Sequence, residues 1–314
     1  GMRAVGVTTY GGPEALELVD LPEVHAGPGE VRLRVYAATV NPTDTYVRNG
    51  DRAKVQSADP GPYVPGMDAA GIVDEVGEGV TTGIAIGDRA MAIVVPKGTH
   101  GAYRENLVLP AGSVTHAPEG TSHAEASTLP MNGLTARLSL DLLGLQPGQT
   151  IAVTGAAGCY GGYVVQLAKA DGLTVIADAS EADTELVTSL GADIVVPRGA
   201  GFAAEVRKHF PNGVDGLADG SVQNDEVIDA IADGGAFTSV RGYQGEPQRD
   251  ITFSVTWVIS YATEHAKLDQ LRAQTEAGEV SLRVAQTYPA AQASEAHARL
   301  EAGGTRGRCV IEFD

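Results

Sequence analysis

A glycine-rich turn after a short apolar run constrains the fold of this chain more than any other feature. Residues 151–154 predict a buried strand, and a helical pattern of apolar residues continues to Ala170. Between the two, glycines recur at intervals of three residues, at Gly155, Gly158 and Gly161. This spacing is typical of a turn whose bare backbone and helix N-terminus hold a pyrophosphate. It predicts a dinucleotide site, and the alternative is a glycine-rich turn without a ligand.

Strand and helix patterns alternate around this turn. The predicted strands are 151–154, 174–177, 194–196, 214–218, 236–240 and 251–257, with helices at 158–170, 182–190 and 202–210. Such alternation predicts an α/β domain in which a doubly wound parallel sheet carries helices on both faces, as in the Rossmann fold. We assign residues 123–262 to this domain.

The first 122 residues have a different pattern. Val31, Leu33 and Val35 alternate with polar residues, which predicts a half-buried strand. Further short apolar runs are separated by Gly/Pro clusters, as expected of a compact β-barrel-like domain. After residue 262 the chain continues to a predicted helix at 290–302 and a last strand at 308–313. We therefore assign residues 1–122 and 263–314 to one domain.

Composition excludes several classes of partner. The chain has 314 residues, of which 43% are apolar, and a formal net charge of −18. Nucleic acid and anionic membranes would repel such a chain, so neither is an expected partner. Cys159 and Cys309, the two cysteines, suggest no disulfide framework. With no apolar run of about 18–20 residues and no signal peptide pattern, we expect a cytoplasmic protein.

An acidic residue follows the glycine turn at the distance expected for ribose recognition. Asp178 ends the next predicted strand, where a carboxylate can bind the ribose hydroxyls of NADH and repel the 2′-phosphate of NADPH. Residues 179–185 contain no Lys or Arg, and Arg198 is the nearest basic candidate. These residues favour NADH over NADPH, although Asp178 could equally be a solvated strand end or a helix cap.

Two motifs in the first domain make a resemblance specific. Asn-Pro-x-Asp-x-Tyr at 41–46 and Pro-Gly-x-Asp-x-x-Gly at 65–71 resemble signatures of the quinone oxidoreductases within the medium-chain dehydrogenase/reductase superfamily. Residues 87–89, 129–136 and 303–308 are similar to further landmarks of that family. The resemblance implies a GroES-like β-barrel domain, a Rossmann domain with NADH or NADPH, and a homodimer formed through 251–257. It also implies hydride transfer from NAD(P)H to a small molecule, either a quinone or an α,β-unsaturated carbonyl.

The positions that bind zinc in metal-dependent relatives carry other residues. Asp44 stands where the first cysteine would be, and Met67-Asp68 where His-Glu would be. The four-cysteine lobe for structural zinc is missing, and the seven histidines show no paired spacing. Zinc prefers tetrahedral sets of Cys, His and carboxylate ligands, so we expect no metal.

A zinc-free site must stabilise the developing oxyanion with hydrogen-bond donors. The resemblance places Asn41 and Tyr46 beside the nicotinamide, and both side chains can donate. Asp44 and Asp68 would order the neighbouring backbone. Purely structural roles stay open for all four, because Asn-Pro also starts turns and a tyrosine can simply stack on a flat substrate.

The resemblance also identifies cofactor-binding positions. It adds Asn132, Thr135, Val240, Arg241 and Arg308 to the residues that the sequence pattern itself marks, which are Gly155, Ala156, Ala157, Gly158, Cys159, Tyr160, Gly161, Asp178 and Arg198. Cys159 and Tyr160 depart from the family, which has small residues there. Tyr160 could narrow the cleft or reach a phosphate. Cys159 is interpreted as a small filler rather than a redox group, and Arg308 could be a solvated charge.

Two other functions compete with this interpretation. A zinc-free enoyl-thioester reductase would need a larger, basic pocket for a phosphopantetheine or CoA arm, of which this acidic chain gives little sign. A nucleotide-binding redox sensor without turnover would not need Asn41 and Tyr46. No Tyr-x-x-x-Lys motif supports short-chain dehydrogenase chemistry.

Overall fold

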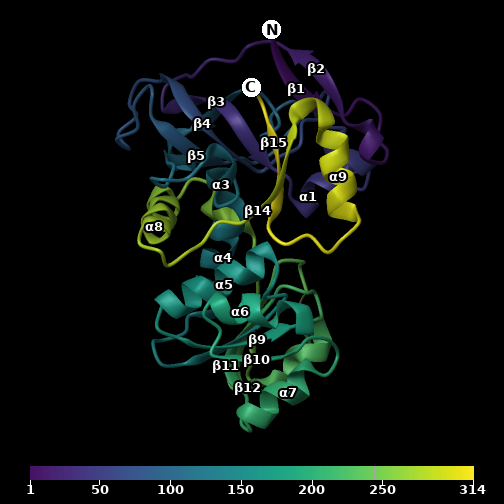
Figure 1. Cartoon of the computed structure of the whole chain (residues 1–314), viewed down its shortest axis with the longest axis vertical. Coiled ribbons are helices and arrows are strands. Elements are labelled where there is room, and N and C mark those ends of the chain that lie inside the picture. Colours follow the sequence, from purple (N-terminus) through teal and green to yellow (C-terminus); the bar gives the residue numbers. More distant parts are fainter. Residues whose placement is uncertain (244) are drawn as a thin grey trace. The chain divides into compact units, whose positions relative to one another are not determined.

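The chain forms two compact units. The computed structural model describes residues 1–243 and 245–314 (Figure 1). Unit 1 comprises Gly1–Met131 and Ile259–Asp314, and unit 2 comprises Asn132–Val258. The sequence placed these boundaries at 122/123 and 262/263. The two divisions differ at residues 123–131 and 259–262, which the structure groups with unit 1.

Unit 1 is built on a mainly antiparallel sheet. Its seven strands are ordered β14-β15-β3-β4-β5-β7, and β6 also pairs with β3. The bounds are β3 (Glu30–Thr39), β4 (Asp68–Val76), β5 (Arg89–Ile93), β6 (Asn106–Pro110), β7 (Val114–His116), β14 (Val284–Pro289) and β15 (Arg308–Glu312). A separate antiparallel pair joins β1 (Met2–Gly6) and β2 (Glu17–Leu21). The alternation predicted for β3 is confirmed, because Val31, Leu33 and Val35 are fully buried.

Five helices belong wholly to unit 1: α1 (Pro42–Asn49), α2 (Ala53–Gln56), α3 (His123–Ser127), α8 (His265–Glu276) and α9 (Ala293–Glu301). Two contacts tie α3 to this unit. The ring of His123 stacks on Tyr36 with centroids 4.9 Å apart, and the hydroxyls of Ser127 and Thr39 lie 2.8 Å apart. These contacts hold α3 against the sheet of unit 1.

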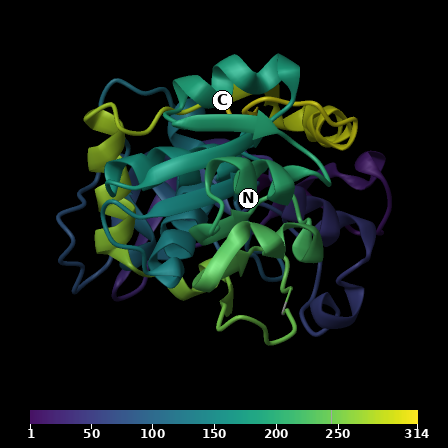
Figure 2. The same cartoon turned by 90° about the horizontal axis from the view of Figure 1, so that it is seen from below.

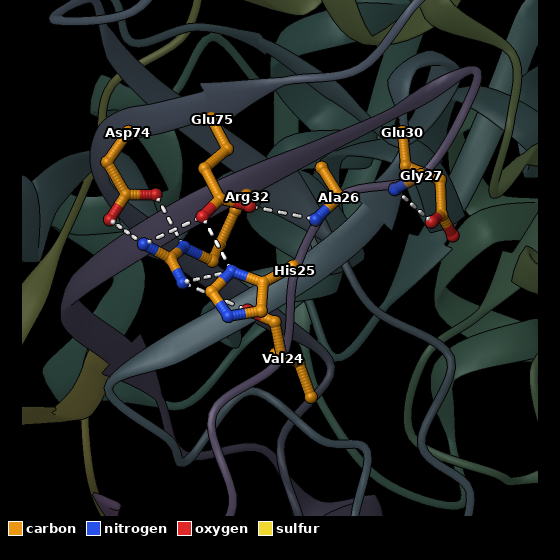
Figure 3. Close-up of polar contacts among 8 residues, drawn as sticks. All are labelled: Val24, His25, Ala26, Gly27, Glu30, Arg32, Asp74 and Glu75. Carbon is orange, nitrogen blue, oxygen red and sulfur yellow. Dashed lines mark hydrogen bonds and ion pairs between the residues drawn. The ribbon is translucent and has the colours of Figure 1, made fainter.

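A charged cluster holds the loop before β3 against the sheet (Figure 3). Arg32 on β3 donates from Nε to Asp74 Oδ1 at 2.8 Å, and from Nη1 to the carbonyl of Val24 at 2.9 Å. Glu75 Oε2 lies 2.8 Å from His25 Nδ1. Since Arg32 touches both the loop and β4, its side chain fixes this end of unit 1.

Unit 2 contains the predicted parallel sheet. Its strand order is β10-β9-β8-β11-β12-β13, and every neighbouring pair is parallel. The bounds are β8 (Thr150–Thr154), β9 (Thr174–Ala179), β10 (Ile194–Pro197), β11 (Val214–Asp219), β12 (Ile231–Ser239) and β13 (Thr252–Val255). Strand order reverses between β8 and β11, where doubly wound sheets bind their ligands.

Helices cover both faces of this sheet (Figure 2). They are α5 (Cys159–Ala170), α6 (Thr184–Ser189) and α7 (Phe202–His209), while α4 (Pro130–Leu143) carries the junction between the units. Residues 224–230 form a 3-10 helix. The Rossmann-like architecture predicted from the alternating pattern is thus confirmed. None of the helices in the described residues is long and apolar enough to cross a membrane.

Candidate functional site

The start of α1 assembles the candidate site of unit 1. Asn41 caps the helix in an extended conformation, Pro42 occupies its first turn, and Gly50 ends it with φ of 95°. Asp44 Oδ2 accepts the backbone N–H of Asn41 at 2.9 Å. Proline at the first helical position and a carboxylate that reaches back to the cap both favour helix initiation here. The sequence therefore fixes the backbone that carries the predicted catalytic residues.

Asp68 connects this helix start to a second element. Asn41 Nδ2 donates to Asp68 Oδ1 at 3.1 Å, and the Met131 N–H donates to Asp68 Oδ2 at 3.1 Å. Asn41, Asp44 and Asp68 are all fully buried. The structure thus brings together three of the four predicted catalytic residues. Asp68 orients the Asn41 amide and also holds the start of α4.

Burial dominates the electrostatics of the two carboxyls. Loss of solvation raises the pKa of Asp44 to about 6, although the Asn41 N–H, the Tyr103 hydroxyl, the Gly66 N–H and the charge of Arg308 favour the ionised form. Burial likewise raises the pKa of Asp68 well above its usual range, and the nearby charge of Asp44 raises it further. The cluster therefore takes up a proton more readily than two exposed aspartates would.

Tyr46, the fourth predicted catalytic residue, lies one turn further along α1 and is half-buried. The guanidinium carbon of Arg52 sits 5.4 Å from the centre of its ring. A cation over the ring face orients the aromatic plane without using the hydroxyl.

Three residues that the sequence did not identify support Asp44 from distant parts of the chain. The Tyr103 hydroxyl donates to Asp44 Oδ2 at 2.8 Å and lies 3.0 Å from His297 Nε2. Arg48 Nη1 lies 2.8 Å from His297 Nδ1. No local pattern in the sequence marks them, because Tyr103 and His297 are 194 residues apart.

The glycine turn of unit 2 forms a second candidate site. Gly155 has φ of 69°, which favours glycine, and Gly158 caps α5 with extended backbone. A Cβ on Gly161 would lie 2.1 Å from the carbonyl oxygen of Gly155. The turn therefore closes tightly against the first turn of α5, whose N-terminus can bind anionic groups. This cradle fits the pyrophosphate of a dinucleotide.

Asp178 lies at the end of β9, beneath the turn. Its Oδ2 accepts the N–H of Gly155 at 3.1 Å, its Oδ1 accepts the N–H of Ala156 at 3.0 Å, and the residue is 4% exposed. Burial raises the pKa of Asp178, against these two hydrogen bonds and the charge of Arg198. The carboxylate therefore shapes the turn directly, a contact that the sequence did not predict.

Tyr160 occupies the reversal of strand order. An added Cβ on Gly220, just after β11, would lie 3.2 Å from the Tyr160 ring. The Tyr160 hydroxyl lies 2.7 Å from Ser139 Oγ. Ser139 Oγ lies 2.8 Å from Thr256 Oγ1, and Thr256 Oγ1 lies 2.7 Å from Thr238 Oγ1. The bulky residue is thus anchored within unit 2. Its neighbour Cys159 is buried, as a small filler would be.

The remaining predicted cofactor residues are spread over both units. Asn132 and Thr135 lie buried on α4, Val240 and the exposed Arg241 follow β12, and Arg198 is exposed after β10. Arg308 starts β15 in unit 1, where its charge lowers the pKa of Asp44 and Asp68. The structure therefore links Arg308 to the buried cluster of Asp44 and Asp68.

The donor set of unit 1 does not fit zinc. Across the described residues, no group of three or more His, Cys, Asp or Glu side chains could hold a metal ion. Both oxygens of Asp68 and Oδ2 of Asp44 already accept hydrogen bonds from N–H or O–H groups. Tetrahedral zinc needs four converging ligands, and this cluster supplies two carboxylates, three of whose four oxygens already accept hydrogen bonds while Asp44 Oδ1 has no hydrogen-bond partner among the described residues.

Comparison with known proteins identifies the family. Residues 27–119 match the alcohol dehydrogenase GroES-like domain, and residues 190–311 match the zinc-binding dehydrogenase family. A quinone oxidoreductase of Pseudomonas aeruginosa is 30% identical, with 98% of this chain and 99% of that protein covered. The chain belongs to the medium-chain dehydrogenase/reductase superfamily. Its GroES-like and Rossmann units, predicted from the sequence, are those of this superfamily.

Other proteins of the superfamily are similar to this chain over most of its length. The 2-methylene-furan-3-one reductase of Solanum lycopersicum is 30% identical, with 99% of this chain and 79% of that protein covered. A solved NAD-dependent alcohol dehydrogenase matches with a TM-score of 0.86 and 32% identity over the whole of both chains. A mycobacterial quinone oxidoreductase matches with a TM-score of 0.84 and 29% identity, also over both whole chains. As a medium-chain dehydrogenase/reductase, the protein is an oxidoreductase that uses a pyridine nucleotide.

Proposed function

We propose that this enzyme reduces a small quinone or α,β-unsaturated carbonyl with NAD(P)H and without zinc. The observation that carries the proposal is the buried cluster of Asn41, Asp44 and Asp68. There, hydrogen bonds occupy both oxygens of Asp68 and Oδ2 of Asp44, and no His or Cys of the described residues completes a metal site. The names of the quinone oxidoreductase and furanone reductase relatives support the same substrate class.

The reaction adds a hydride and a proton to the acceptor. A bound nicotinamide supplies the hydride. The backbone at 155–161 holds the phosphates of the nucleotide, since bare N–H groups at a helix N-terminus suit anions. Asn41 and Tyr46 orient the acceptor and donate hydrogen bonds to the oxygen on which negative charge develops. Because an enone or quinone delocalises this charge, hydrogen-bond donors suffice where an alkoxide would need a Lewis acid.

Nucleotide choice follows from charge around Asp178. We propose that NADH is preferred, because an ionised Asp178 repels a 2′-phosphate and residues 179–185 offer no compensating cation. Arg198 lies near enough to lower the pKa of Asp178, and its exposed side chain is the cation that would favour NADPH.

A homodimer is proposed through the open edge of the parallel sheet. β13 is the last strand of that sheet, and Val255 and Trp257 beside it are 43% and 62% exposed. Unpaired strand edges favour pairing with another chain. We further propose a cytoplasmic location, which agrees with two buried, unbridged cysteines in the chain.

A steady-state screen tests the proposal. NADH and NADPH are each combined with 1,4-benzoquinone, 9,10-phenanthrenequinone, a simple enone and crotonyl-CoA, using protein assayed for bound zinc. We expect turnover with a quinone or the enone, faster with NADH, from zinc-free protein. Turnover with crotonyl-CoA alone would assign an enoyl-thioester reductase. Nucleotide binding without turnover of any acceptor would assign a sensor.

A further inference from the structure

An unbroken line of hydrogen bonds connects Asp44 with the C-terminal helix of unit 1. From Asp44 it passes through the hydroxyl of Tyr103 and the imidazole of His297 to the guanidinium of Arg48, with separations of 2.8, 3.0 and 2.8 Å. Arg48 then pairs with Glu301. The line thus joins α1, the segment before β6 and α9 through side chains alone.

All members except the last are withdrawn from solvent. Asp44, Tyr103 and His297 are fully buried, and Arg48 is 2% exposed. Only Glu301 reaches the surface, with a side-chain exposure of 41%. Polar groups at such depth are costly unless each is satisfied, so a complete line at this place needs an explanation.

The chemistry of Arg48 fixes the direction of every hydrogen bond. A guanidinium can only donate, so His297 Nδ1 must accept. A neutral imidazole then carries its proton on Nε2 and donates it to the Tyr103 oxygen. Tyr103 in turn donates its hydroxyl proton to Asp44 Oδ2. Burial and the neighbouring charge of Arg48 lower the pKa of His297 to about 3, which is consistent with a neutral ring.

The same chemistry excludes a proton path from the surface. Arg48 stays protonated in proteins, so a proton cannot pass through it from Glu301 to His297. Arg48 also closes the outer end of the line with hydrogen bonds from Nε to the Gly11 carbonyl at 3.2 Å and from Nη1 to His297. The line therefore holds its members in place and leaves proton delivery to another route.

We propose that His297 and Tyr103 are positioning residues of the enzyme, with His297 acting as the Nε2–H tautomer. Together they hold the Asp44 carboxylate where it accepts the Asn41 N–H. That contact fixes the start of α1 and so the amide of Asn41, which faces Asp68. The inference rests on the proposed function only in its kinetic consequence, because the tautomer and the geometry do not depend on turnover.

Substitutions separate positioning from simple packing. His297→Leu removes both hydrogen bonds at similar volume, while His297→Gln keeps a donor that can reach Tyr103. We expect kcat to fall about tenfold to a hundredfold in His297→Leu, as for small misplacements in an active site. His297→Gln should recover most of the loss. His209, exposed at the end of α7, provides the control substitution His209→Gln.

A pH profile provides a second readout. The groups that face Asp44 are the backbone N–H of Asn41 and of Gly66, Tyr103, Asp68 and Arg308. Tyr103→Phe removes one donor to the ionised carboxylate, so the pKa of Asp44 rises further. The acid limb of kcat/KM should then move to higher pH, while the Kd for the nucleotide, bound by unit 2, changes less than about twofold. A packing defect would lower kcat without moving the limb.

Nitrogen-15 NMR of His297 tests the proposed tautomer independently of activity. The Nε2–H tautomer at pH 7, lost as a distinct signal in His297→Gln, supports the proposal. An imidazolium or an Nδ1–H tautomer would overturn it, as would His297→Gln being as slow as His297→Leu while melting at the wild-type temperature. If the wild type turns over no acceptor, the proposed function fails, and the NMR result still tests the positioning line.

Discussion

The candidate sites of the two units are built from different materials. In unit 1, charged and polar side chains from α1, β4 and α9 are buried and interlocked. In unit 2, the turn at 155–161 offers main chain, and its function depends on side chains being absent. The cluster in unit 1 therefore depends on the identity and protonation of particular groups, and the glycine turn in unit 2 depends on the space around its backbone. Substitutions should lower stability or activity for electrostatic reasons in unit 1 and for steric reasons in the glycine turn of unit 2.

The largest effect is expected from a single methyl group in the turn. Gly161→Ala places a Cβ 2.1 Å from the Gly155 oxygen, and backbone cannot move aside cheaply. We expect a loss of roughly 3 kcal/mol or more in unfolding free energy, the upper end for overpacking. The nucleotide Kd should rise at least about tenfold. Chemical denaturation and fluorescence titration measure the two.

Gly158→Ala is the matched control for Gly161→Ala. The same added atom would lie 3.3 Å from the Gly155 oxygen, in extended backbone that alanine adopts. Its unfolding free energy should change by less than about 1 kcal/mol. Equal losses in the two variants would mean that crowding does not set the tolerance of the turn.

In unit 1 the comparable test is pH. Because the pKa of Asp44 is raised from 3.8 to about 6, this carboxyl binds its proton more tightly in the folded chain. Its contribution to stability is full below pH 3.8 and is lost as pH rises through about 6. The pKa difference between the unfolded and the folded chain corresponds to about 3 kcal/mol of unfolding free energy.

Asp44→Asn has no such ionisation. The variant should gain up to about 3 kcal/mol relative to wild type between pH 4 and 7, and lose activity. Urea denaturation across this range measures the difference. A constant gap between the two proteins at all pH values would show that Asp44 does not ionise within it.

Asp178 affects both the shape of the glycine turn and the charge near it. Asp178→Ser removes the acceptors of the Gly155 and Ala156 N–H groups, so both nucleotides should bind about tenfold more weakly. Because the negative charge that repels the 2′-phosphate is removed, binding of NADPH should weaken less than binding of NADH. The ratio of NADPH to NADH use should therefore rise. Competitive titration of each nucleotide gives both numbers. A uniform loss would make Asp178 a residue that shapes the turn and does not select the ribose.

The smallest effect is expected for the Tyr160 hydroxyl, which is one end of a line of four hydrogen-bonded hydroxyls. Tyr160→Phe leaves Ser139 bonded to Thr256, so stability should fall by about 1 kcal/mol with little change in nucleotide Kd. Ser139→Ala removes the fully buried centre of the line and should cost more. Thermal melts compare the two, and a larger loss in Tyr160→Phe would contradict this order.

Local patterns predicted much of the fold. The strand, glycine turn and helix at 151–170 and the alternation along β3 depend on neighbours in the sequence, and both are confirmed. α1 was interpreted only as a polar cluster after a strand, although its start signals were present in Asn41, Pro42 and Asp44 and its stop in Gly50. The low apolar content of residues 42–49 hid the helix.

Contacts between distant residues could not be predicted in the same way. Arg48 and His297 are 249 residues apart, and a single histidine in a helical pattern gives no sign of its partner. Likewise, α3 carries a good helix start at Ser122, yet only its packing on Tyr36 and Thr39 shows which unit it joins. Propensity determines that a helix forms, and tertiary packing determines where it belongs.

Unit 1 is completed by residues 259–314, which return to it after the whole of unit 2. This order has a consequence for biosynthesis. The ribosome synthesises the parallel sheet of unit 2 before His297, so the hydrogen bonds that join His297 to Tyr103 and Arg48 can form only after α9 has been made. A nascent chain that ended between these two stages would contain the glycine turn at 155–161 but lack the contacts that α9 makes with Tyr103 and Arg48.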